Sequence, residues 1–157
     1  MKTVYETIGL TGSGKSTWAR YFIKDRPKIK IVSPDGFRSM LNGEYAYHVE
    51  LDDVITQSTY DTAKNLLEAG YDVVIDCGNL TNASDRRGKW RQLPADKFIA
   101  VMMPMDKPVE WYVDRRKTNP HWPVNVEQIV MNEMKAYEPP KLGEFDKIIH
   151  ITAKEIE

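Results

Sequence analysis

The sequence predicts an α/β fold in which helices cover both faces of a parallel sheet, and three observations predict it. Segments rich in apolar and β-branched residues alternate along the chain with segments whose apolar residues recur at helical spacing. A glycine-rich loop at residues 9–17 joins the first strand-like segment to the first helical one. The 157 residues suffice for one domain that buries about two-thirds of its unfolded surface. We therefore expect a single domain over residues 1–157.

Five short apolar segments are typical of strands in a parallel sheet, because such strands are covered on both faces. Val4, Tyr5, Thr7 and Ile8 give the first segment its β-rich pattern. Prolines flank the second segment and end the fourth, as expected where proline is confined to the ends of buried strands. The predicted strands are residues 4–10, 28–33, 71–76, 98–103 and 147–151.

Five further segments have the apolar spacing of helices and carry start or stop signals. Gly70 ends the second helix, and Thr81 or Ser84 can cap the third, which stops before Pro94. Pro108 fits the first turn of the fourth helix. The predicted helices are residues 16–24, 51–68, from 81 or 84 to about 93, 108–115 and 126–137.

The composition limits the kinds of partner that the chain can have. A formal net charge of −1 gives no general attraction to a polyanion, so nucleic-acid contact requires a local basic cluster such as residues 86–91 or 115–117. Either cluster can equally be a solvated helix face. The single cysteine, Cys77, excludes an internal disulfide. No apolar run has membrane-spanning length and no signal-peptide pattern is present, so we expect a cytoplasmic protein with no membrane partner.

The glycine-rich loop fits the pattern of a phosphate-binding loop at every specified position. Glycines allow backbone N–H groups to point at a phosphate, a lysine adds positive charge, and a serine hydroxyl can bind Mg²⁺. A strand before the loop and a helix after it present a helix N-terminus to the anion. The alternative is a glycine-rich turn that happens to contain Lys-Ser. The residues expected to bind ATP are Gly12, Ser13, Gly14, Lys15, Ser16 and Thr17.

Two carboxylates follow predicted strands and should lie near this loop, because open α/β sheets bind ligands at the carboxyl ends of their strands. Asp35 follows the second strand, where it can act as a general base, cap a short helix, or do both. Asp76 ends the third strand. The acidic and aromatic residues 42–53 are compatible with a substrate-side loop or with a plain surface loop.

Three groups of residues together resemble the 5′-kinase domain of phage-type polynucleotide kinases. They are residues 12–20, the pair Asp35 and Arg38, and residues 76–80 with an arginine pair shortly after. The resemblance extends from about residue 1 to 135. It implies a P-loop kinase fold with strand order 2-3-1-4-5 and a small lid at about residues 115–125. It also implies ATP with Mg²⁺ as donor and a DNA or RNA 5′ end as acceptor.

The resemblance also implies a role for each matching residue. Asp35 would be the general base, and Ser16 and Asp76 would hold Mg²⁺. Cys77, the position after Asp76, is where several family members have the aspartate, so the register of the metal carboxylate is open. The lid pattern has two arginines four residues apart, and here the second position is Asn119. The other implied roles are catalysis by Lys15, Arg115 and Arg116, where either one arginine acts alone or the lid geometry differs. Arg38, Asn79, Arg86 and Arg87 would bind substrate, with two alternatives open: Asn79 orients the acceptor or the turn, and one of the two neighbouring arginines only faces solvent.

Three functions are compatible with these residues. The first is an ATP-dependent polynucleotide 5′-hydroxyl kinase. The second is a small-molecule or nucleoside kinase of the same fold, which needs Asp35 but not the basic residues around Arg38, and which the near-neutral charge favours slightly. The third is a nucleotide-binding module or ATPase that transfers phosphate to water, against which Asp35 argues.

Overall fold

The centre of the molecule is one sheet of five parallel strands. The computed structural model describes residues 1–81, 87–116 and 125–156. Within them the strands follow the order β2-β3-β1-β4-β5, which confirms the order that the resemblance implied. The strands are β1 (Thr3–Ile8), β2 (Ile29–Val32), β3 (Asp72–Ile75), β4 (Lys97–Met102) and β5 (Lys147–His150).

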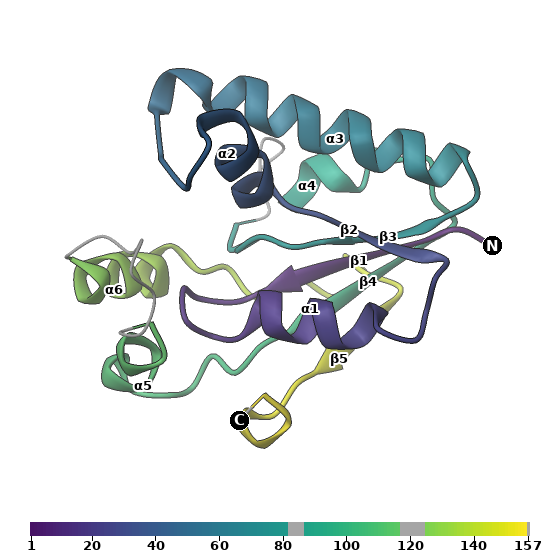
Figure 1. Ribbon diagram of the computed structural model, residues 1–157. Coiled ribbons are helices and arrows are strands. Elements are labelled where there is room, and N and C mark those ends of the chain that lie inside the picture. The colour runs from purple at the N-terminus through teal and green to yellow at the C-terminus, as the bar shows by residue number, and fades with distance from the viewer. Residues whose placement is uncertain (82–86, 117–124, 157) are drawn as a thin grey trace.

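Helices cover both faces of this sheet (Figure 1). Helix α1 lies on one face, and α3 and α4 lie on the other, as the alternation of strands and helices predicts. Helices α2, α5 and α6 gather near the carboxyl ends of the strands, together with the loop between β1 and α1. The helices are α1 (Lys15–Ile23), α2 (Pro34–Asn42), α3 (Asp52–Glu68), α4 (Arg87–Trp90), α5 (Val109–Asp114) and α6 (Val126–Ala136).

Strand β1 shows how the sheet is buried on two sides. Val4 belongs to a core with Leu67 of α3, whereas the next residue, Tyr5, makes an edge-on ring contact with Phe22 of α1 at 5.0 Å between centroids. Successive side chains of a strand point to opposite faces, so β1 supplies apolar side chains to both cores. This burial fixes β1 at the centre of the sheet and the loop after it at the edge of the site.

Two helices differ from prediction in detail. The helix expected from residue 81 or 84 to about 93 ends earlier, since α4 (Arg87–Trp90) is followed by a turn; Ser84 and the other residues of 82–86 lie outside the described residues. The helix after β2 is capped by Ser33, whose hydroxyl accepts a hydrogen bond from the Gly36 N–H at 3.2 Å. Capping of this helix, which was the alternative role for Asp35, is therefore performed by Ser33 instead.

Two short 3₁₀ turns were not predicted: η1 (Val49–Leu51) lies within the acidic stretch, and η2 (Ala153–Glu155) follows β5.

In the described part of the chain, no helix combines the length and the apolar character needed to cross a bilayer. The predicted lid at about residues 115–125 mostly coincides with residues 117–124, outside the described ranges. What the fold does provide is a common edge where β1, β2 and β3 all end.

Candidate active site

The glycine-rich loop has the backbone conformation that its glycines allow. Gly12 and Gly14 have φ values of 80° and 97°, in the left-handed region where a side chain is strained. Gly14 precedes α1, so the loop leads directly into the N-terminus of a nine-residue helix. A side chain at Gly12 would also collide with the carbonyl oxygen of Tyr112 in α5. The loop is therefore shaped by its own glycines and by close packing against α5.

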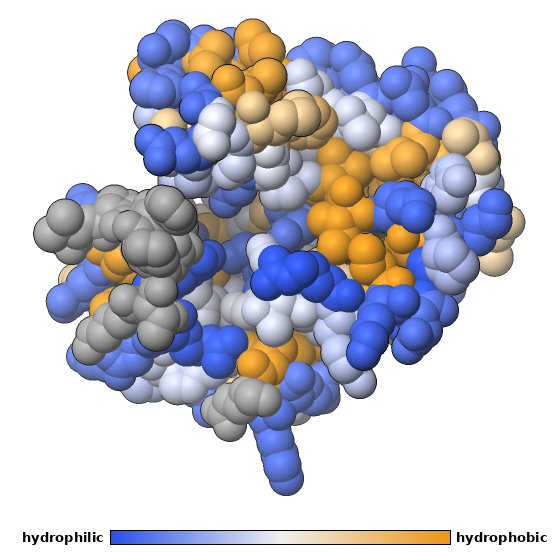
Figure 2. Space-filling view, viewed as in Figure 1, coloured by the Kyte–Doolittle hydropathy of each residue, from blue (hydrophilic) through white to orange (hydrophobic). Residues whose placement is uncertain are grey.

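A cavity of about 650 Å³ lies beside this loop. Loop residues, Asp35 and Ser39 of α2, Asp76 after β3, and both arginines at the end of α5 line it. Figure 2 shows the hollow between the part of the surface over α2 and α3 and the part over α5 and α6. Segments far apart in the sequence thus share one cavity, as expected at the carboxyl ends of neighbouring parallel strands.

Ser16 and Asp76 form an oxygen pair in this cavity. The Ser16 hydroxyl donates to Asp76 Oδ2 at 2.8 Å. Burial raises the pKa of Asp76, and the bond from Ser16 and the charge of Lys15 act in the opposite direction. Hydroxyl and carboxylate oxygens are ligands that Mg²⁺ accepts while keeping waters and substrate phosphates. The two side chains fit a magnesium ion that is bound together with a nucleotide.

Cys77 does not compete with Asp76 for this position. Its thiol donates to Asn79 Oδ1 at 3.0 Å, and burial raises its pKa to about 12, so the sulfur stays protonated. Asp76 lines the cavity and Cys77 does not. The geometry favours Asp76 as the carboxylate beside Ser16.

Lys15 is turned back onto the loop. Its ammonium donates to the carbonyl oxygens of Gly9 at 3.1 Å and Leu10 at 2.8 Å. Burial lowers its pKa, whereas the nearby carboxylates Glu133 and Asp76 raise it. A lysine that depends on neutral carbonyl groups for hydrogen bonds can exchange them for charged phosphate oxygens, which form stronger bonds.

Asp35 reaches the same cavity from α2. Its side chain is 58% exposed, and one oxygen accepts from Arg38 Nη1 at 2.8 Å. Arg38 itself is only 14% exposed, because it also donates to Asp52 Oδ1 at 2.9 Å and lies over the ring of Tyr47. Asp35 lines the cavity, whereas Arg38 stands behind it. The structure brings Asp35 to the loop and holds Arg38 beside it.

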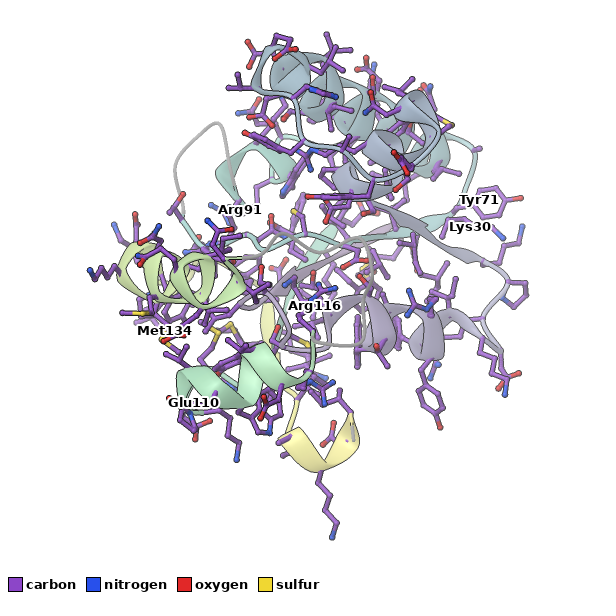
Figure 3. The ribbon with its side chains drawn as sticks, turned by 60° about the vertical axis from the view of Figure 1, so that its left-hand side comes forward. Lys30, Tyr71, Arg91, Glu110, Arg116 and Met134 are labelled. Carbon is purple, nitrogen blue, oxygen red and sulfur yellow. The ribbon has the colours of Figure 1, made fainter. Side chains whose placement is uncertain are left out.

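Arg115 and Arg116 both reach the loop from the end of α5. Arg115 Nε donates to the Gly12 carbonyl at 2.9 Å, and its guanidinium lies over the ring of Trp111. Arg116 points toward the middle of the molecule (Figure 3) and lines the cavity. Burial lowers its pKa, opposed first by the carboxylate of Asp35 and then by Glu133. Two cations thus face the donor loop without an arginine at position 119.

Asn79 and Arg87, predicted to bind substrate, are instead internal. Asn79 donates to the Thr7 carbonyl and accepts from the Trp90 indole, which fits the turn that it makes at φ 49°. Arg87 is fully buried and paired with Glu144 at 2.8 Å. Both side chains hold the fold together at this point. For Asn79 this agrees with the alternative of a role in the turn, whereas for Arg87 it differs from the predicted contact with substrate. Arg86 lies outside the described residues.

Tyr45 and Glu133 are among the residues at the site that were not predicted. Tyr45 lines the cavity and comes from the acidic and aromatic stretch, for which a substrate-side loop was one of two interpretations. Glu133 lies on α6, where both of its carboxylate oxygens are 3.3 Å from the Thr11 nitrogen of the loop. The aromatic residues of the stretch 42–53 are a sequence signal that could have indicated Tyr45. No pattern in the sequence indicates that Glu133 reaches the loop.

Comparison with known proteins gives one family and a set of similar folds. A family model described as AAA domain matches residues 4–140. A solved structure of the Pnkp1/Rnl/Hen1 complex contains a chain that is 28% identical, with a TM-score of 0.62, over 73% of this chain and 39% of that one. A structure of the Pnkp1/Rnl/Hen1 RNA repair complex gives 23% identity and a TM-score of 0.70, over 86% of this chain and 43% of the other.

A third similar structure is the Mycobacterium tuberculosis APS kinase in complex with AMPPNP and APS. Its identity is 20% and its TM-score 0.63, over 95% of this chain and 87% of that one. The chain therefore has the fold of P-loop kinases, including one that binds a nucleotide analogue. It spans less than half the length of the two chains from the Pnkp1/Rnl/Hen1 complexes.

Proposed function

The chain belongs to the AAA domain family and has the P-loop kinase fold, and from this premise we propose that it transfers the terminal phosphate of ATP to the 5′-hydroxyl of a nucleic-acid end. The observation that carries the proposal is a cavity with two different sides. Lys15 and Ser16 of the donor loop lie on one side, and Asp35 of α2 lies on the other. A donor loop alone would serve an ATPase, whereas a carboxylate that faces it can serve an acceptor hydroxyl.

Each residue of the site has a distinct part in this reaction. Asp35 takes the proton of the attacking hydroxyl while that oxygen bonds to the γ-phosphorus and the bond to the ADP oxygen breaks. Lys15, Arg115 and Arg116 neutralise charge on the transferring phosphate. Ser16 and Asp76 would hold Mg²⁺, which when bound offsets negative charge on the phosphates of ATP.

The nucleic-acid acceptor is supported by Arg38 and by the likeness to the Pnkp1 complexes. Arg38 is held by Asp35 and Asp52, so its guanidinium is fixed next to the proposed base. A planar guanidinium binds phosphate well, and a phosphate beside the acceptor sugar is present in every nucleic-acid end longer than a nucleoside. The chain from the Pnkp1/Rnl/Hen1 complex is 28% identical.

A small-molecule or nucleoside acceptor is the second candidate, and one observation favours it. The chain around the cavity residue Tyr45 is acidic, because the exposed carboxylates Glu44 and Glu50 lie close to it in sequence, although neither lines the cavity. Carboxylates repel the phosphates of a long strand, but they do not repel a neutral sugar or nucleoside.

One labelling experiment separates these functions. The chain is incubated with γ-labelled ATP, Mg²⁺ and either a 5′-hydroxyl oligonucleotide, a nucleoside or a sugar. We expect the label on the oligonucleotide. Label on the nucleoside or sugar alone would support the second candidate, and release of phosphate without any labelled acceptor would support an ATPase.

Replacement of Asp35 tests the proposed base. We expect Asp35→Asn to reduce transfer by roughly 100-fold or more, because general-base catalysis typically contributes 10²–10⁴-fold. Asp53→Asn is a matched control, since Asp53 is exposed at the start of α3 and does not line the cavity. Transfer is measured with the labelled oligonucleotide. Near-normal transfer by Asp35→Asn would show that another group accepts the proton.

A further inference from the structure

Glu133 brings a carboxylate from α6 to the donor loop. Both of its oxygens are 3.3 Å from the Thr11 nitrogen, so they share one backbone N–H at the long end of hydrogen-bond distance. One turn earlier on the same helix, Val130 packs in a buried cluster with Leu10 and Tyr112. Helix α6 is thus anchored against the loop, and Glu133 is held there rather than extending into solvent.

The negative charge of Glu133 acts on the cations of the donor site. It raises the pKa of Lys15 and of Arg116, in both cases against the larger effect of burial. A carboxylate that acts on both cations and contacts the loop backbone lies close to the region where phosphates of a nucleotide would bind. Like charges in a partly buried site repel each other strongly.

Two cationic side chains at the loop also have internal partners. Lys15 donates to the Gly9 and Leu10 carbonyls, and Arg115 donates to the Gly12 carbonyl. These neutral partners can be exchanged for phosphate oxygens at little cost, since a charged acceptor is the stronger one. Glu133 differs from them because it is itself an anion, contributed by a helix at a distance of 122 positions in the sequence.

We propose that Glu133 is an internal competitor for the phosphates of the nucleotide: its carboxylate occupies the Thr11 N–H, and a bound polyphosphate displaces it from the loop. Part of the binding free energy of ATP is spent on this displacement. Because Glu133 belongs to α6, loading of the loop also releases one contact between that helix and the loop. The proposal rests on nucleotide binding by the loop and does not depend on the acceptor.

Binding measurements on a neutral variant test the competition. The full chain is titrated by calorimetry with ATP and, separately, with inorganic triphosphate, which lacks the base and sugar. We expect Glu133→Gln to bind both about tenfold more tightly than the unmodified chain. A tenfold change in Kd corresponds to about 1.4 kcal/mol. The difference should shrink in high salt, because added ions screen charge repulsion.

The matched control is Glu127→Gln. Glu127 is exposed on the same helix, and its replacement removes the same charge. The Glu127→Gln variant should therefore bind ATP and triphosphate as the unmodified chain does. Glu133→Asp keeps the charge on a shorter side chain and should bind with intermediate affinity, which gives a second test if Glu133→Gln does not fold. Equal or weaker binding by the Gln variant would overturn the proposal and indicate that Glu133 positions the loop. Failure to label an oligonucleotide, with these affinities as expected, would refute only the proposed acceptor.

Discussion

Glu6 is a carboxylic acid enclosed in the centre of the sheet. It occupies a position between Val4 and Ile8 on β1, is fully buried, and has no hydrogen-bond partner for either carboxylate oxygen in the described residues. Burial raises its pKa to about 8, Arg91 and Arg87 lower it, and Glu144 raises it further. Glu6 is therefore mostly protonated at neutral pH, when an exposed glutamate would be ionised.

This raised pKa predicts that the protein loses stability as the pH rises. In the unfolded chain Glu6 has an ordinary pKa near 4.5, so between about pH 4.5 and 8 the folded state binds more protons than the unfolded state. The free energy of unfolding should fall across this window by at most about 1.4 kcal/mol per pH unit. Above pH 8 the loss should level off.

The neutral variant Glu6→Gln should lack this dependence. Urea unfolding at pH 5, 6.5 and 8 gives the free energy of unfolding of both proteins. The value for Glu6→Gln should rise steadily relative to that of the unmodified chain as the pH rises. Glu110→Gln, an exposed change on α5, should run parallel to the unmodified chain. A constant difference between Glu6→Gln and the unmodified chain would mean that Glu6 titrates normally.

At the scale of elements, α4 is held to the segment between α6 and β5 by one buried cation, Arg87. Arg87 donates to Glu144 from two nitrogens, at 2.8 and 3.3 Å, and to the carbonyls of Asn79 and Glu138. Arg91, one turn later, adds a second contact to Glu144 at 3.1 Å. These contacts fix the position of the described part of α4.

Removal of this cation should destabilise the whole domain. Arg87→Met leaves Glu144 and two carbonyl groups with fewer partners, and breaking a buried ion pair typically costs about 3–5 kcal/mol. We expect about 3 kcal/mol in urea unfolding, since Arg91 retains part of the interaction. Lys64→Met, which breaks the exposed pair with Glu68, should cost less than about 1 kcal/mol. Equal effects of the two changes would contradict a structural role for Arg87.

The same elements show what the sequence can predict. All five strands lie within three residues of their expected bounds, because a buried parallel strand has a short apolar run that few other structures share. Helix α4 is less predictable, because its position depends on the contact between Arg87 and Glu144, which are 57 positions apart in the sequence. Capping of α2 by Asp35 was one of two roles open to that residue, yet Ser33 is the cap; the sequence does not separate them, since both residue types are good caps.

At the scale of the molecule, the residues of the donor loop are neighbours in the sequence, whereas the other residues of the site come from separate parts of the chain. The loop residues are contiguous, and the rule that ligands bind at the carboxyl ends of strands brings Asp35 and Asp76 to the same cavity. No such rule gives the direction of a side chain that follows a strand. Asn79 and Arg87 therefore proved internal, and Glu133 reached the loop without any signal in the sequence.

Charge over the whole molecule predicts how an acceptor strand binds. The net charge is −1, and the surface around the turn between α2 and α3 is apolar and acidic, with Met40, Leu41, Tyr47, Val49 and Val54 exposed (Figure 2). Such a surface offers a long strand few cations. We expect contact with only one or two acceptor phosphates, next to Arg38.

The salt dependence of KM measures the number of phosphate contacts. For single strands the logarithm of the binding constant falls by about 0.7 per contact for each unit of log salt. The KM of a 12-nucleotide 5′-hydroxyl acceptor should therefore rise with a slope of about 0.7 to 1.4, close to that of a 3′-phosphorylated mononucleotide. A slope above about 3 for the longer acceptor alone would indicate an extended cationic track.

The last described residues rest on the donor loop, and this affects how the protein can be handled. A Cβ at Gly14 would lie 2.8 Å from Ile156 Cδ1, and Arg115 donates to the Ile156 carbonyl at 3.4 Å. Met1, by contrast, precedes β1 at the opposite end of the sheet (Figure 1). A fluorescent label attached at Ile156 would therefore lie at the donor loop and disturb nucleotide binding. A label attached at Met1 would leave the loop untouched.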